Sequence, residues 1–388
     1  MALIHDAIVV GARCAGAATA MVLAGSGHRV LMVDQASFPS DIMSTCYIHQ
    51  PGVARLSEWG ILPALLETGC PRLTRLTHTI GPVAVSGRIP EYEGVDFAVA
   101  PRRHLLDQVL VDAAQAVGAE FRPRTKLIDL IHREGRVVGV RLRGHDGAVS
   151  EEYGRAVIGA DGMRSAVARL SRAAQTVDDG RRTCVYYTGW RLGGDEVRIV
   201  ESHHRSLSVI PTHHGVSLIA TYAPQREFWR IRTDPLRFHL ETIRELAPDL
   251  DDLLRNTEPV MRLTGTGDQR NYFREPAGRG WALVGDAGHH KDSITARGIT
   301  DAFAQAELLG QSLAGRCGSD QAVDAALAEF ARRRDASVAE SYAATLTTTA
   351  LELSARRLET HRRVSTSAAL TEIYLAALAG IRPAGVSG

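Results

Sequence analysis

Trp281-Ala-Leu-Val-Gly285-Asp286-Ala-Gly288-His289-His290, followed shortly afterwards by Gly298, is the stretch of sequence that decides the fold. Its first four residues predict a short apolar strand and the glycines predict a tight turn, with a helix from about Ile299. A single Gly-Asp turn is weak evidence, because most such dipeptides are ordinary surface turns. Its weight comes from a similar strand, glycine turn and helix some 270 residues upstream.

The upstream stretch is Ile8-Val-Val-Gly11-Ala-Arg13-Cys14-Ala15-Gly16. An Ala-rich helix is predicted from Ala15 to Ala24 and a second strand from His28 to Val33, with Asp34 and Gln35 at its end. A strand, glycine turn, helix, strand and acidic residue in this order are typical of a dinucleotide-binding unit. Two such turns at opposite ends of one chain predict a single extended ligand held at both, as FAD would be.

Each part of this unit has a physical role. Gly11 makes the turn, Gly16 lets the helix and strand pack closely, and the helix N-terminus offers N–H donors to a pyrophosphate. Asp34 would accept hydrogen bonds from the adenosine ribose. Arg13 departs from the G-x-G-x-x-G pattern, since it replaces the middle glycine. Either Arg13 points away and the backbone still binds phosphate, or its guanidinium contacts the phosphate itself.

The middle of the chain changes its period. Residues 125–159 read as short strands with tight turns, which predicts a three-stranded antiparallel meander that leads into an apolar strand, Ala156 to Ala160, and then Asp161-Gly162. Residues 183–223 alternate as strands, helical patterns follow to about Leu254, and the chain after residue 299 reads as helix up to a Gly/Pro/Ser tail. Arg103 stands at the start of an amphipathic helix, because Leu106 and Leu110 share its face. A solvated Arg103 is an equally good reading of that helix.

These patterns predict an α/β fold in two interleaved parts. The first is a Rossmann-like FAD-binding domain with a three-stranded meander and a helical C-terminus, formed by residues 1–75, 100–180 and 268–388. The second is an antiparallel-sheet substrate domain formed by residues 76–99 and 181–267. A chain of 388 residues is long enough for about two domains.

Composition restricts the class of protein. The net charge of +1 gives no argument for nucleic acid or an anionic membrane as a partner. Five cysteines without CxxC spacing fit reduced thiols in a cytoplasm better than disulfides or a metal site. No signal-peptide pattern opens the chain, and no apolar run reaches the roughly 18 residues of a membrane span. We therefore expect a soluble, cytoplasmic monomer or homodimer that binds a small-molecule substrate and no metal.

With these pieces in place, the chain resembles the FAD-dependent aromatic-hydroxylase family. That family has the p-hydroxybenzoate hydroxylase fold and also includes geranylgeranyl-reductase-like enzymes. The resemblance covers essentially the whole length and depends on four signals in the right order. They are Gly11–Gly16 with Asp34, Arg103, Asp161-Gly162, and Gly285-Asp286 with Gly298.

The resemblance implies roles for these residues. The N-terminal turn, Asp34 and Gln35 hold the ADP half of FAD, and Arg103 contacts the cofactor backbone. Asp161-Gly162 is implicated in FAD and NAD(P)H contacts, Asp286 binds ribityl and pyrophosphate, and Gly298 and Ile299 open a helix whose N-terminus faces the flavin pyrimidine. A helix N-terminus there stabilises an anionic reduced flavin. Ser293 and Arg297 depart from the family, which often has Pro and Gln at these places.

The implied activity is that of a single-component monooxygenase. NAD(P)H would reduce FAD, and a flavin C4a-hydroperoxide would then hydroxylate an aromatic or polyketide-like substrate lying against residues 183–223. His289, His290 and His49 are the candidates for a base, since histidine titrates near working pH. Each is equally well explained as a hydrogen-bonded structural residue. Of the aromatic and histidine residues on the alternating strands, such as Tyr186 and Tyr187, at most about half can line the pocket.

Other classes remain as alternatives. A reductase of a carbon–carbon double bond would share every cofactor motif. A flavin halogenase is disfavoured, because its Trp-x-Trp-x-Ile-Pro signature is absent, and neither Lys126 nor Lys291 stands where that family has its catalytic lysine. A non-catalytic FAD-binding protein is possible because of Arg13, Ser293 and Arg297. A simple NAD-binding dehydrogenase leaves Gly285-Asp286 without a role.

Overall fold

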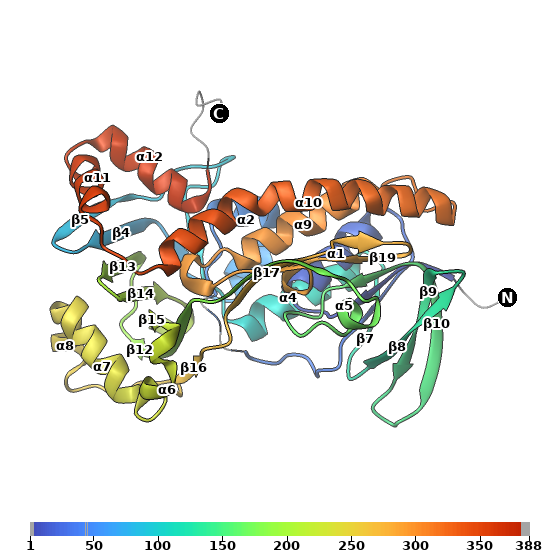
Figure 1. The fold of residues 1–388 in the computed structure, drawn as a ribbon, viewed down its shortest axis with the longest axis horizontal. Coiled ribbons are helices and arrows are strands. Elements are labelled where there is room, and N and C mark those ends of the chain that lie inside the picture. The colour runs from blue at the N-terminus through green and yellow to red at the C-terminus, as the bar shows by residue number, and fades with distance from the viewer. Residues whose placement is uncertain (1–3, 43, 45, 382–388) are drawn as a thin grey trace.

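The strand-helix-strand unit predicted at the N-terminus is present in the computed structural model, which describes residues 4–42, 44 and 46–381 (Figure 1). β1 (Ile4–Val10) pairs in parallel with β2 (Val30–Val33), and α1 (Cys14–Gly25) connects them. α9 (Gly298–Leu313) approaches α1 closely at one of its own glycines. A Cβ added to Gly310 of α9 would lie 2.3 Å from Cγ1 of Val22.

The first sheet has eight strands. Six follow the order β18-β19-β10-β1-β2-β7, and the β8–β9 pair extends the sheet from β10. The further strands are β7 (Glu120–Arg122), β8 (Lys126–Arg133), β9 (Arg136–Arg143), β10 (Val149–Gly159), β18 (Ala277–Gly278) and β19 (Trp281–Leu283). β2, β1, β10 and β19 run in parallel, so the turns that follow them are gathered at one edge.

The meander differs from the expectation in one respect. β8, β9 and β10 form the predicted antiparallel meander, but its third strand and the apolar strand from Ala156 are one continuous strand. The first part of β10 pairs antiparallel with β9, and its last part pairs in parallel with β1. The change from polar to apolar residues within β10 marks where it leaves the meander and enters the buried sheet.

Both faces of the first sheet are covered, which explains the unbroken apolar run in β1. Ala7 and Val9 lie in the largest apolar core, and Ile8 and Val10 lie in a second core under the meander. The first core is closed by α1, α9 and a further set of helices: α2 (Gln50–Glu58), α3 (Leu62–Glu67), α4 (Arg103–Ala116) and α10 (Asp320–Thr349). The second includes side chains of α5 (Ala166–Leu170).

A second sheet of seven strands lies beside the first, at the left of Figure 1. Its order is β16-β12-β15-β14-β13-β4-β5. The strands are β4 (Arg75–Ile80), β5 (Val83–Arg88), β12 (Thr183–Arg191), β13 (Glu196–Ser202), β14 (Arg205–Pro211), β15 (Val216–Pro224) and β16 (Thr264–Thr266). The sheet is antiparallel except where β13 pairs in parallel with β4, a contact over more than 100 residues that strand periodicity does not predict.

Helices cover the second sheet from two sides. α6 (Phe228–Ile231), α7 (Pro235–Leu246) and α8 (Pro248–Leu254) follow β15, and residues of α7 and α8 pack with Trp190 and Leu207 of the sheet. The C-terminal pair, α11 (Ala355–Ser365) and α12 (Ala368–Ala379), packs on the β4–β5 side through Val364 and Leu375. The predicted Gly/Pro/Ser tail lies outside the described residues.

A small antiparallel sheet stands between the two larger ones. Its order is β11 (Gln175–Arg181), β17 (Arg270–Arg274) and β20 (His289–His290). β20 follows the Gly-Asp turn directly, where the sequence predicts a loop. A short pair, β3 (Arg72–Leu73) with β6 (Ala98–Val99), completes the strands. Within the described part of the chain, the helices are all too short or too polar to cross a membrane.

Candidate cofactor site

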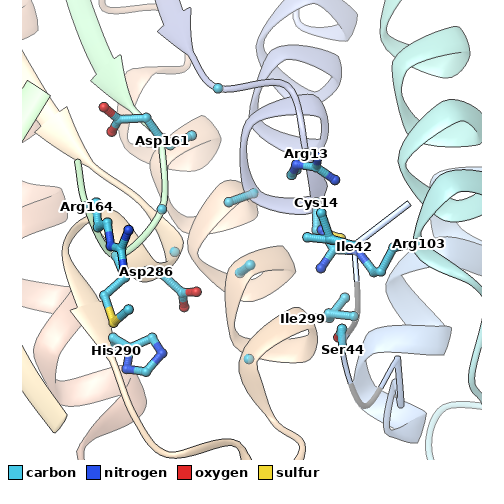
Figure 2. Close-up of a pocket in the computed structure, with 18 of the residues that line it drawn as sticks. Arg13, Cys14, Ile42, Ser44, Arg103, Asp161, Arg164, Asp286, His290 and Ile299 are labelled. Atoms are coloured by element: carbon cyan, nitrogen blue, oxygen red, sulfur yellow. The ribbon is translucent and has the colours of Figure 1, made fainter. Parts of the chain in front are cut away.

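The turns at the edge of the first sheet open into a cavity of about 790 Å³. Ligand cavities commonly measure roughly 300–1,000 Å³, so this one suits a large ligand. Its lining reaches from Asp34 at the end of β2 to Tyr187 on β12 of the second sheet. Figure 2 shows Asp161, Asp286 and His290 on one side of it and Arg13, Cys14 and Arg103 on the other.

The glycine turn brings the N-terminus of α1 to the cavity. Gly11, Arg13, Cys14 and Ala15 line it, and none of the described side chains caps the helix, so the N–H groups of its first turn are available to a ligand. Gly11 has φ +101°, and a Cβ there would lie 2.4 Å from the carbonyl oxygen of Ala160. A Cβ on Gly16 would lie 1.7 Å from the carbonyl oxygen of Gly11. Gly16 does not line the cavity, so close packing is its role.

Asp34 is fixed by the turn that it follows. Its two carboxylate oxygens accept hydrogen bonds from the backbone N–H of Ala12 and of Ala36, both at 2.8 Å. Each oxygen keeps a second lone pair. Asp34 and Gln35 both line the cavity, so the carboxylate is held ready to accept hydroxyl donors of a ribose.

Arg13 and Arg103 share a buried partner that the sequence analysis missed. Asp107 is fully buried, and its carboxylate accepts from Arg13 Nη1 at 2.9 Å and from Arg103 Nη2 at 3.1 and 3.2 Å. Cys14 Sγ lies 3.2 Å from the same carboxylate, and burial raises the pKa of this thiol, so Cys14 is the donor. Ser40 accepts a further bond from Arg13 at 2.9 Å.

These contacts show where the side chain of Arg13 lies. Its guanidinium is tied to Asp107 and Ser40, and it still lines the cavity, with 26 % of its side chain exposed. Arg103 lines the cavity as well, and it is buried and not solvated. The spacing of Arg103 and Asp107, four residues apart on a helix, is the sequence signal that predicts their pairing.

Asp161 and Gly162 lie at the end of β10, as predicted, but the carboxylate of Asp161 is already engaged. It accepts from Ser165 Oγ at 2.5 Å and from the backbone N–H of Ala166 and Val167 at 2.6 and 3.1 Å. It therefore caps α5, and burial raises its pKa against the effect of these donors. Asp161 and Gly162 both line the cavity, and a Cβ on Gly162 would meet open space.

The second glycine turn faces the first across the cavity. Gly285 approaches α1 so closely that a Cβ would lie 2.7 Å from Cβ of Ala15. Asp286 is exposed, and its carboxylate has no hydrogen bond to another residue of the described ranges. Gly298 and Ile299 also line the cavity at the start of α9, which has no side-chain cap from the part of the chain that the structure describes. A second helix N-terminus thus faces the same ligand.

His290 is the one candidate base that the structure brings to the cavity. Its Nδ1 is hydrogen-bonded to the backbone carbonyl of Arg270, and a carbonyl only accepts. Nδ1 therefore carries the hydrogen in the neutral ring, and Nε2 keeps its lone pair. The ring stacks on Tyr272 with centroids 5.8 Å apart, which fixes its orientation.

His289 and His49 lie outside this cavity. His289 faces away from His290 on β20 and lines a neighbouring chamber of about 10 Å³, and burial next to Lys291 and Arg334 lowers its pKa far below the usual value. His49 precedes α2, with its Nε2 3.2 Å from the carbonyl oxygen of Thr295, and burial lowers its pKa to about 3. Both are neutral structural residues in this arrangement.

The two departures from the family pattern have local partners. Ser293 lines the cavity and is hydrogen-bonded to Gln269 and Tyr222. Arg297 reaches the C-terminus of α12, where its Nη1 lies 3.4 Å from the carbonyl oxygen of Leu378. In the parts of the chain with described positions, acidic, histidine and cysteine side chains form no cluster suited to a metal ion.

The cavity fits an extended dinucleotide. Two uncapped helix N-termini suit its negative charge, Asp34 and Asp286 supply acceptors for hydroxyl groups, and two arginines line the wall. Lys291 is a further lining residue, and no motif in the sequence pointed to it. It is buried and paired with Asp301 of α9, and burial lowers its pKa although Asp301 opposes the change.

Comparisons with known proteins agree with this geometry. The sequence model described as "FAD binding domain" matches residues 5–345. The digeranylgeranylglycerophospholipid reductase of Methanocella arvoryzae is 23% identical over 328 residues, which cover 80% of this chain and 77% of that protein. The structure of the flavin-dependent brominase Bmp2 matches with a TM-score of 0.85 and 16% identity, covering 97% and 94% of the two chains. PqsL, a probable FAD-dependent monooxygenase from Pseudomonas aeruginosa, matches with a TM-score of 0.72 and 17% identity, covering 97% and 100%.

Proposed function

Because the chain belongs to the FAD-binding-domain family of flavoprotein oxidoreductases, we propose that it is a single-component monooxygenase that hydroxylates an aromatic or polyketide-like molecule. Bound FAD supplies the redox chemistry, passing electrons from NAD(P)H to O₂. The protein binds and orients the reactants and controls protons. The substrate would lie where the second sheet, through Tyr187, meets the cavity.

The observation that carries this proposal is the state of His290. Its Nδ1 is committed to the carbonyl of Arg270, so the neutral ring offers the lone pair of Nε2. The imidazole lines the cavity and is stacked on Tyr272. A fixed ring with one free basic nitrogen suits removal of a proton from a phenolic or enolic hydroxyl, which makes the substrate more electron-rich.

Isotope labelling tests the proposal. The FAD-loaded protein is reduced photochemically, so that the test does not depend on the choice of NADH or NADPH, and is mixed with ¹⁸O₂ and a panel of phenols and polyketide-like enols. We expect a product that contains one ¹⁸O atom, and its yield should fall in His290→Gln but not in His145→Gln, an exposed histidine between β9 and β10. A protein that takes up FAD and yields no labelled product with any substrate of these classes would refute the proposal.

A reductase is the second candidate, favoured by the relative named as a digeranylgeranylglycerophospholipid reductase. Such an enzyme would transfer a hydride from reduced FAD to one carbon of a double bond and a proton to the other. The same reduced protein, mixed under anaerobic conditions with isoprenoid alkenes, distinguishes the two. Reoxidation of FAD together with a product two mass units heavier than the alkene would assign the reductase.

A further inference from the structure

A hydrogen-bond chain with a fixed direction leads to Ser293. It begins at Asp292, which is 1% exposed and whose Oδ2 accepts from Thr183 Oγ1 at 2.7 Å. Because the hydrogen of Thr183 is used there, its oxygen accepts from Gln269 Nε2 at 2.9 Å. Asp292, Thr183 and Gln269 are all buried, so this direction is set inside the protein.

The orientation of the Gln269 amide follows from both of its ends. Its Nε2 faces Thr183, and its Oε1 accepts from the backbone N–H of Ser293 at 3.1 Å and from Ser293 Oγ at 2.5 Å. A backbone N–H only donates, so the atom facing it is the amide oxygen. The hydroxyl hydrogen of Ser293 is therefore directed at Gln269.

Tyr222 supplies the next donor. Its hydroxyl lies 3.2 Å from Ser293 Oγ, and burial raises the pKa of this phenol, so it keeps its proton. Since the hydrogen of Ser293 points to Gln269, Tyr222 donates to Ser293. A serine oxygen accepts up to two hydrogen bonds, and Tyr222 uses one of them. The second lone pair has no partner in the described part of the protein, and Ser293 lines the cavity near Gly298.

We propose that Ser293 is a cofactor-contacting residue that offers the bound FAD an acceptor and no donor, and that it thereby recognises the N–H that reduction creates at N5 of the flavin ring. This inference rests on the FAD site of the proposed function. Reduction of a flavin adds a hydrogen at N5, whereas the N–H at N3 is present in both redox forms. An acceptor that faces N5 and cannot turn into a donor therefore favours the reduced ring.

The effect is measured as the ratio of the affinities for reduced and oxidised FAD. Loss of one hydrogen bond to a polar group lowers such a ratio by about fivefold to tenfold. A tenfold change corresponds to about 30 mV in the midpoint potential of a two-electron couple. We expect Ser293→Ala to lower the midpoint potential of the bound FAD by up to this amount.

The experiment compares three variants with the wild type, using protein stripped of FAD and reloaded. Midpoint potentials are determined by equilibration with reference dyes under anaerobic conditions. Ser293→Ala should lower the ratio, and Gln269→Met should lower it as well, because the freed serine hydrogen can then point into the cavity. Tyr222→Phe removes a buried hydroxyl of the same chain but leaves the lone pair, so its ratio should stay within twofold of the wild type.

Two results would overturn the inference. One is a ratio within twofold of the wild type in Ser293→Ala, and the other is an equal loss in Ser293→Ala and Tyr222→Phe, which would assign the effect to packing. Gln269→Met carries the test if Ser293→Ala does not fold. If the variants show the expected ratios but the wild type, although it binds FAD, forms no oxygenated product, the proposed function is refuted and this inference stands.

Discussion

Asp107 holds two cations at the wall of the cavity, and its replacement by Asn is the sharpest test of the structure. The carboxylate is fully buried and pairs with Arg13 and with Arg103, which is itself 9% exposed. Breaking a buried ion pair from one side leaves an uncompensated charge and costs about 3–5 kcal/mol. Asn keeps the shape and one acceptor oxygen, so we expect Asp107→Asn to lower the free energy of unfolding by about 3 kcal/mol.

The assay is urea unfolding of the FAD-free protein, followed by tryptophan fluorescence. Asp112→Asn is the matched control, because Asp112 lies on the same helix, is exposed and accepts a single bond from Gln108 at 2.7 Å. This change should stay within about 0.5 kcal/mol of the wild type. A loss below about 1 kcal/mol in Asp107→Asn would refute the reasoning, since it would mean that the two arginines do not need the buried charge.

Added FAD extends the test to whether the guanidinium of Arg13 contacts the pyrophosphate. If Arg13 and Arg103 face the pyrophosphate, its negative charge compensates them when Asp107 is neutral. FAD should then bind Asp107→Asn more tightly than the wild type. Saturating FAD should therefore narrow the stability difference between the two proteins, since a ligand that binds only the folded state stabilises it more when it binds more tightly. An unchanged difference would show that the backbone of the glycine turn binds the phosphates without help from these side chains.

Three further predictions concern single side chains. Asp286→Ala should weaken FAD binding about tenfold to a hundredfold in a fluorescence titration and leave stability unchanged, because it removes hydrogen bonds of a carboxylate that has no protein partner in the described chain; an unchanged affinity would remove Asp286 from the site. Burial lowers the pKa of His49 and of His239, a buried residue of α7, to about 3, so the unfolded chain binds more protons below pH 6.5. The free energy of unfolding from urea titrations should therefore fall as pH drops from 6.5 towards 4, and His239→Asn should reduce this slope by about 1.4 kcal/mol per pH unit; a flat profile would contradict this. Arg297→Gln removes the bond to the carbonyl of Leu378 and should speed amide exchange in α12 while α9 keeps its protection, and equal exchange in both proteins would count against the contact.

The sequence predicted the parts of the site that depend on local geometry. Gly11 and Gly16 stand where a Cβ would collide with backbone, and such positions show in sequence because only glycine fits. Asp34 and Asp286 were also predictable, because Asp34 directly follows an apolar strand and Asp286 lies in the glycine turn that follows one. The FAD-binding fold itself followed from the order and spacing of these turns along the whole chain.

Contacts between distant segments were not predictable in the same way. Asp107 pairs with Arg13 across 94 positions of sequence, and β13 pairs with β4 over more than 100 residues. No period or propensity in either segment specifies its partner. The surroundings of His49 were not predictable for the same reason, because its place in the chain gave no sign that the carbonyl of Thr295 would accept a hydrogen bond from its ring in a buried position.

Ser293 and Arg297 show why a departure from a family pattern does not by itself argue against function. Each departing side chain has a hydrogen-bond partner on an element that the cofactor motif does not contain: Ser293 has Tyr222 on the second sheet, and Arg297 has the carbonyl of Leu378 at the end of α12. The substitutions therefore connect the cofactor cavity to the second sheet and to the C-terminal helices, and these are the places where the specificity of this enzyme should differ from that of its relatives.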